Sequence, residues 1–197
     1  MRVWILLLVV ALAGAWQFVA NREISRPPGV LAAAEPRQES ITGTPPKFAI
    51  KGYTLTALAS FDATARVISA EHYHFDRESD LAPVDLALGW GAMSDTAVLR
   101  QLSFSQDHRF YYYRWSVAPP IPANDIVTHS ANMHLIPATT DVAKRLSRVR
   151  AGNLVHFSGY LVRVDAPDGW HWVSSLTRTD TGAGACELVW VEDLEAS

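Results

Sequence analysis

Cysteine is nearly absent from this sequence: Cys186 is the single one among 197 residues. One thiol cannot form an intrachain disulfide, so the chain is not a disulfide-rich scaffold, and it lacks the paired cysteines of a zinc knuckle. Glycine-rich phosphate loops, dinucleotide-binding fingerprints and the Gly-x-Ser-x-Gly motif are absent as well. These absences remove the usual sequence support for nucleotide-dependent and serine-based enzymes, and we expect no cofactor.

The sequence also lacks a large excess of charge of either sign. Its 17 basic and 20 acidic residues give a formal net charge of −3 at pH 7, which provides no reason to expect nucleic acid as a partner. Hydrophobic residues make up 49% of the chain and charged residues 19%. That balance is typical of a folded globular domain and not of a disordered protein.

A long apolar run lies at the N-terminus, in residues 1–21. Arg2 precedes about 18 mostly apolar residues ending at Ala20, which is just long enough to span a bilayer and is also typical of an export signal. Trp16 and Phe18 at the end of the run are typical of a membrane interface and favour a retained anchor over a cleaved signal peptide. We therefore expect a single-pass protein of the inner membrane with its domain in the periplasm, and secretion to the periplasm is the alternative.

The rest of the chain divides into two parts by composition. Residues 22–47 are rich in proline, alanine and polar side chains, which predicts a flexible linker between the membrane and the domain. Residues 48–197 carry the apolar and aromatic runs of a β-rich globular domain. Three runs in its first half predict strands: Tyr53–Ser60, Ala65–Phe75 and Phe110–Val117.

The strongest pattern lies near the C-terminus. Two β-rich runs, Asn153–Val164 and Trp170–Leu176, flank Asp165-Ala-Pro-Asp-Gly169, and a third run begins at Glu187. Because Pro-Asp-Gly is typical of a β-turn, the pattern predicts a hairpin followed by a third strand. The apolar positions of the first run change parity at Gly159, which predicts a bulge or bend and a change of the buried face there.

Two helices are indicated between the predicted strands. Thr139 or Thr140 can cap a helix over Thr140–Arg150, and Ser94-Asp95 can cap a shorter one that ends at Leu102. A helix that leads into a bent strand, after a block of earlier strands, has the order of an OB-type barrel. The sequence thus predicts an α+β fold, as a β-rich single domain that forms either an OB-like small barrel or two packed antiparallel sheets with inserted short helices.

Cys186 is the candidate nucleophile. A thiol is activated by a neighbouring imidazole, and His129 and His134 are the candidate bases. However, Cys186 opens an apolar strand, where a small buried side chain is the commoner role, and it carries no local signature of a cysteine hydrolase. A thiol-dependent hydrolase is therefore the alternative to a non-catalytic protein.

Histidines provide a second alternative, a metal-binding protein. His72 and His74 lie on one face of a predicted strand, about 7 Å apart at Cα. Two imidazoles so placed can chelate a metal ion, but a protein site needs a third and a fourth ligand. The sequence names neither of them.

Two loops are the predicted binding surfaces. Asp76–Met93 reads as a long connection, and such connections are often functional; its part Pro83–Met93, which contains Trp90, is the first predicted binding surface. Arg178 and Asp180 belong to a polar loop after the predicted hairpin. The leading hypothesis is a non-catalytic envelope protein that binds an envelope partner or a small ligand through these loops.

Three stretches carry a resemblance to known sequences: Pro83–Asp95 (PVDLALGWGAMSD), His129–Pro137 (HSANMHLIP) and Ser174–Glu187 (SSLTRTDTGAGACE). They resemble a group of bacterial exported or membrane-anchored proteins of unknown function. The similarity extends over most of the domain from about Tyr53. It implies a bacterial envelope protein and carries no catalytic residue across.

Overall fold

The computed structural model describes residues 22–177 and 185–197. The predicted signal peptide or anchor, residues 1–21, lies outside these described residues, as do Arg178 and Asp180. Within the two described ranges, no helix is long and apolar enough to span a membrane.

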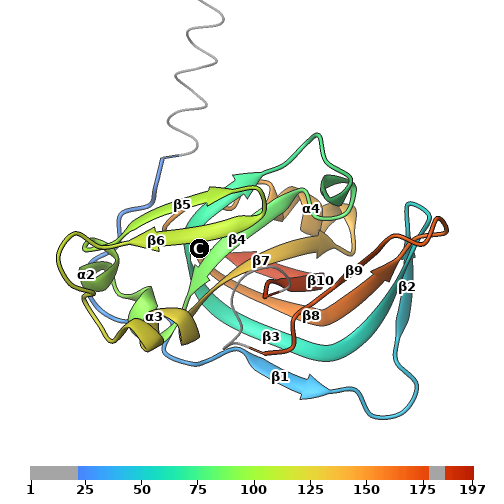
Figure 1. Ribbon diagram of the computed structural model, residues 1–197, viewed down its shortest axis with the longest axis horizontal. Coiled ribbons are helices and arrows are strands. Elements are labelled where there is room, and N and C mark those ends of the chain that lie inside the picture. Colours follow the sequence, from blue (N-terminus) through green and yellow to red (C-terminus); the bar gives the residue numbers. More distant parts are fainter. Residues whose placement is uncertain (1–21, 178–184) are drawn as a thin grey trace, which may run out of the picture.

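The described chain is β-rich with short helices, which confirms the predicted α+β class (Figure 1). One large mixed sheet is joined by a small two-stranded sheet. The large sheet contains β1 (Arg37–Ser40), β2 (Lys47–Ile50), β3 (Tyr53–His72), β4 (Val84–Gly89), β7 (Ser130–Pro137), β8 (Leu154–Asp165), β9 (His171–Val173) and β10 (Glu187–Ala196); β5 (Ser103–Asp107) and β6 (Phe110–Arg114) form the small one. The helices are η1 (Glu78–Asp80), η2 (Gly91–Ser94), α2 (Thr96–Leu99), α3 (Ala123–Thr128) and α4 (Thr140–Leu146).

Five strands of the large sheet pair into a closed ring. The first part of β3 pairs with β8 and its last part with β4, both antiparallel. β4 then pairs with β7, β7 runs parallel to β10, and β10 returns to β8. Because β7 and β10 are parallel, the sheet is mixed, so the predicted alternative of two packed antiparallel sheets is wrong.

The length of β3 makes this closure possible. Within its 20 residues, Leu55–Ala65 alternate between buried and partly exposed positions, and small residues such as Ala59 and Ala63 face the core. Register shifts at Ala57/Ala59 with β8 and at Val67/Ser69 with β4 mark bulges, which bend a strand. A bent strand with small inward-facing residues can pair with β8 along one part and with β4 along another, and this closes the ring.

Gly159 lies where β8 meets a bulge in β10. The register shifts between Val191 and Asp193, opposite Gly159 and Ser158, so the irregularity predicted near Gly159 is confirmed, with the extra residue in the partner strand. A Cβ on Gly159 would lie 1.9 Å from the carbonyl oxygen of Trp190, which only glycine can accommodate.

The predicted change of the buried face of β8 occurs, but between Leu161 and Val162, two residues beyond Gly159. Phe157 and Leu161, on either side of Gly159, belong to the same core inside the ring. Val162 and Val164 instead contribute to a second apolar cluster on the other face, which also contains Trp190. Beyond Val162 the former inner face is partly exposed, since the Arg163 and Asp165 side chains are 43% and 42% exposed, and the other face is the buried one.

Local turn and capping chemistry matches the sequence closely. The hairpin of β8 and β9 forms as predicted, with Val164 opposite Trp172. The Thr139 side chain accepts a hydrogen bond from the backbone N–H of Val142 and caps α4, and the Asp95 side chain caps α2. Both helices begin where predicted and end earlier, α4 at Leu146 and α2 at Leu99.

Residues 22–47 differ from the predicted flexible linker. Strand β1 lies within this segment and pairs with β3. Nearer its start, the backbone N–H of Ile24 donates to the carbonyl of Ala151 at 2.9 Å, and the Ser94 hydroxyl accepts from the N–H groups of Leu31 and Ala32, each at 3.1 Å. These hydrogen bonds with the domain hold the segment in place, although its composition alone indicates mobility.

Candidate functional site

A cleft of about 400 Å³ lies where the β5–β6 turn, β7, β9 and the residue before β10 meet. It is the candidate functional site because charged, aromatic and nucleophilic side chains line it together. They include Arg109, Phe110, His134, His171, Trp172 and Cys186.

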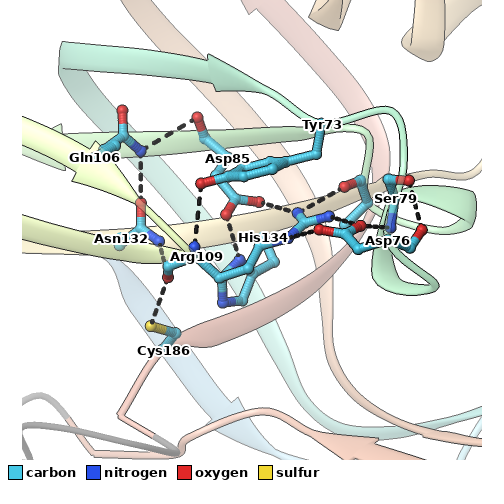
Figure 2. Close-up of polar contacts among 10 residues, drawn as sticks. Tyr73, Asp76, Ser79, Asp85, Gln106, Arg109, Asn132, His134 and Cys186 are labelled. Carbon is cyan, nitrogen blue, oxygen red and sulfur yellow. Dashed lines mark hydrogen bonds and ion pairs between the residues drawn. The ribbon is translucent and has the colours of Figure 1, made fainter.

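Arg109 lies at the centre of the polar network beside this cleft (Figure 2). Its Nη1 donates to Asp85 Oδ1 at 2.8 Å and its Nη2 to Asp76 Oδ1 at 2.7 Å. The guanidinium carbon lies 3.8 Å from the centre of the Tyr73 ring, a cation–π contact. The Arg109 side chain is only 13% exposed, so these contacts replace most of its hydration.

The electrostatics of the network follow from these contacts. Burial lowers the pKa of the Arg109 guanidinium, but the hydrogen bond to Asp76 and the charge of Asp85 outweigh it and hold that pKa above its usual value. Slight burial raises the pKa of Asp76, whereas hydrogen bonds from Arg109 and from the backbone N–H of Ser79 lower it below its usual value. Arg109 and Asp76 are therefore a lasting ion pair at neutral pH.

The backbone at Arg109 is unusual. His108 and Arg109, the two residues between β5 and β6, have φ angles of +50° and +68°. Positive φ at both central positions defines a type I′ turn, which normally uses glycine or asparagine. The tip is held by hydrogen bonds on both sides of Arg109, from its N–H to Tyr73 Oη at 3.1 Å and from Asn132 Nδ2 to its carbonyl at 2.9 Å. Strained backbone held by surrounding structure is typical of a functional site.

Asp85 and His134 are neighbours on β4 and β7, directly opposite in register. Asp85 Oδ2 lies 2.9 Å from His134 Nδ1 as an electrostatic contact without hydrogen-bond alignment, and both side chains are buried. The ring of Trp172 covers the imidazole, with ring centres 4.8 Å apart. The imidazole is therefore confined between a carboxylate and an indole, while His134 still lines the cleft.

Cys186 lies just before β10 and also lines the cleft. It is half-buried, and its Sγ lies 3.8 Å from the carbonyl oxygen of Arg109. The cleft thus contains the predicted nucleophile and one of its two predicted bases, His134. The other, His129, lies outside the cleft before the start of β7, where its Nδ1 contacts the carbonyl oxygen of Asp125 at 2.8 Å. The Cys186–His129 pairing is therefore not supported.

Trp90, a predicted binding residue, does not lie on an exposed loop. Its side chain is fully buried in the core inside the ring. The predicted long connection Asp76–Met93 contains β4, so the residues around Trp90 are core and not an exposed loop. The other predicted binding residues, Arg178 and Asp180, lie outside the described residues.

His72 and His74, the predicted metal-binding pair, have no third ligand in the described chain. Burial, followed by the charge of His74, lowers the pKa of His72. Within residues 22–177 and 185–197, no group of three or more His, Cys, Asp or Glu side chains is arranged to hold a metal ion.

Sequence reasoning missed the two residues that organise the site, Asp85 and Arg109. Asp85 leaves a detectable signal, because it is the single charged residue in the apolar stretch Val84–Trp90. A lone carboxylate there needs a buried partner. Arg109 leaves no such signal.

No family model, curated protein or solved structure matches the chain.

Proposed function

We propose that the chain is a non-catalytic binding domain of OB type, held at the outer face of a bacterial inner membrane by residues 1–21. Strand order supports the fold assignment. An OB-type barrel is a five-stranded Greek-key barrel, and the ring here has five strands in the order β3-β4-β7-β10-β8. Its third and fifth strands in chain order, β7 and β10, run parallel, and α4 lies between its third and fourth.

The observation that carries the proposal is the position of the cleft. OB-type barrels bind ligands between the loop after the first strand and the loop after the fourth. In this chain those connections are residues 73–83, which include Glu78, and residues 166–186, which include Trp172 and Cys186. All three residues line the cleft. The loops that bind ligands in this type of barrel therefore meet at the candidate site.

The chemistry of the cleft favours an uncharged ligand with ring faces, and we propose an oligosaccharide. The charge of Arg109 is balanced by Asp76 and Asp85, so it does not attract an anion. Trp172 and Phe110, which is 37% exposed, offer aromatic faces to the cleft. Aromatic rings combine a large apolar face with low conformational entropy, which suits stacking against sugar rings. A net charge of −3 argues against nucleic acid, the other common ligand of such barrels.

Replacing Trp172 with alanine is expected to weaken oligosaccharide binding by about tenfold or more, because a stacked aromatic ring is removed. The measurement is isothermal titration calorimetry of the full-length chain in a non-ionic detergent, with N-acetylglucosamine tetramer as the probe. Phe110→Ala provides a second test at the other aromatic side of the cleft.

The matched control is Trp115→Ala, which removes an indole that is 38% exposed but does not line the cleft. Equal losses in Trp115→Ala and Trp172→Ala, or no binding of the tetramer by the unchanged chain, would contradict the proposal. Thermal melting of each variant separates lost binding from lost folding.

A second candidate, a thiol-dependent hydrolase, is favoured by one observation: Cys186 and His134 line one cleft, and Asp85 contacts His134. A carboxylate, an imidazole and a thiol are the components of a cysteine-based catalytic centre. Transfer of the thiol proton to His134 would produce a thiolate for attack on an acyl carbon.

This candidate predicts that iodoacetamide alkylates Cys186 at pH 6.5 nearly as fast as at pH 8.5, because the ion pair already exists at the lower pH. The measurement is the alkylation rate of the folded chain by mass spectrometry, with free cysteine as the reference. A rate that rises about tenfold or more between these two pH values, as for an ordinary thiol, would exclude an activated thiol.

A further inference from the structure

A second pocket, separate from the cleft, is lined by several arginines. It has a volume of about 480 Å³ and shares no lining residue with the cleft. Four arginines line it, namely Arg22 and Arg26 from the segment before β1, Arg66 from β3, and Arg100 after α2. One carboxylate, that of Glu23, lines it with them.

Arg66 is the buried member of this group. Its side chain is 3% exposed, and its Nε is buried without a hydrogen-bond partner in the described structure. Nη1 donates to the Thr96 hydroxyl and to the Ser94 carbonyl, while Nη2 reaches Glu23 only at 3.7 Å. An arginine that lines a pocket and has an unsatisfied guanidinium N–H keeps donor capacity for an acceptor from a ligand.

Glu23 balances only part of the positive charge that the arginines bring to this pocket. Arg26 donates from Nε to the carbonyl of Gly152 at 2.9 Å and from Nη2 to the backbone oxygen of Ser197. Arg100 is exposed and has no carboxylate partner among the described residues. Burial, together with the charges of Arg26 and Arg100, lowers the pKa of Arg66, although Glu23 and Asp95 oppose this effect. A bound anion would relieve that repulsion.

We propose that this pocket binds a phosphate group. Guanidinium groups have a planar donor geometry that matches phosphate oxygens in pairs, and arginine is the preferred residue for such sites. This pocket is a second site, separate from the cleft and with its own ligand. Arg66 supplies the buried donor, and Arg22, Arg26 and Arg100 supply charge at the rim.

Two sources of phosphate suit the pocket, a phospholipid headgroup and free phosphate. Apolar side chains adjoin the arginines, including Leu99, Leu102 and Phe104, and these suit the glycerol and upper acyl chain of a lipid. Arg22 follows the apolar run that ends at Ala20 by two positions in the sequence. A membrane segment that ends at Ala20 would place these arginines close to phospholipid headgroups.

The test uses the full-length chain in a non-ionic detergent with three probes. Inorganic phosphate is titrated by calorimetry, and phosphatidylglycerol and phosphatidylcholine are compared as bound species by native mass spectrometry. Binding of phosphatidylglycerol in preference to phosphatidylcholine identifies the headgroup source, and binding of inorganic phosphate alone identifies free phosphate. Either result supports the proposal.

Arg100→Gln is expected to lower the affinity for whichever probe binds by about tenfold, since it removes one charged donor from the rim. Arg22→Gln is expected to act in the same direction. Arg148→Gln, an exposed arginine after α4 and outside the pocket, makes the same change in net charge and is expected to leave binding unchanged. No binding of any probe, or equal losses in Arg100→Gln and Arg148→Gln, would overturn the proposal.

Discussion

Replacing Arg109 with methionine is expected to lower the free energy of unfolding by about 3–5 kcal/mol, because it leaves a buried carboxylate without its partner. Asp85 is fully buried, and its Oδ1 accepts directly from Arg109. His134 contacts the other oxygen but lacks hydrogen-bond alignment, so it does not replace the guanidinium. Methionine retains apolar bulk beside Tyr73 and so isolates the loss of charge.

Urea unfolding of the full-length chain in detergent measures this loss. Arg114→Met is the matched control, because Arg114 is an exposed arginine on the same hairpin and its replacement is expected to change stability by less than about 0.5 kcal/mol. Adding Asp85→Asn to Arg109→Met is expected to recover part of the stability, since a neutral amide needs no counter-charge. A loss below about 1 kcal/mol for Arg109→Met would contradict a central role for this ion pair.

Replacing Gly159 with alanine is expected to destabilise the chain by about 3 kcal/mol, because the added methyl group meets rigid backbone. The Cβ would lie 1.9 Å from the carbonyl oxygen of Trp190. Relief requires β8 and β10 to move apart at the bulge, and both strands belong to the closed ring. The midpoint of urea unfolding, with an unchanged slope, measures the effect.

Gly43→Ala is the comparison for this substitution. Gly43 has φ +83°, but no atom lies within 4 Å of its added Cβ, so only the cost of backbone conformation remains, about 1 kcal/mol. Similar losses for the two substitutions would mean that the close approach of β8 and β10 is not what requires glycine at position 159.

Local chemistry determined several elements from the sequence alone. The Pro-Asp-Gly turn and the flanking β-rich runs predicted the β8–β9 hairpin, which forms. The capping residues Thr139 and Asp95 predicted where α4 and α2 begin. These signals act over a few residues, between a side chain and nearby backbone, so they operate before any tertiary contact is made.

Strand β4 was missed because both of its faces are buried. All six residues of β4, Val84–Gly89, are buried, so the stretch has no alternation of apolar and polar positions. A short apolar run of this kind has no period that separates a strand from a loop that packs into the core. Strand β7 differs, because Ser130–Leu135 alternates polar and apolar residues, a strand signal that was missed.

The site depended on tertiary structure still more. Asp85, Arg109, His134 and Cys186 come from four separate segments of the chain and meet only after the ring closes. Cysteine and histidine were candidates from the sequence because their side-chain chemistry is known in advance. Their pairing, the burial of Trp90 and the role of Arg109 were decided by tertiary packing, since strand register and the placement of the loops together determine which distant residues share an environment.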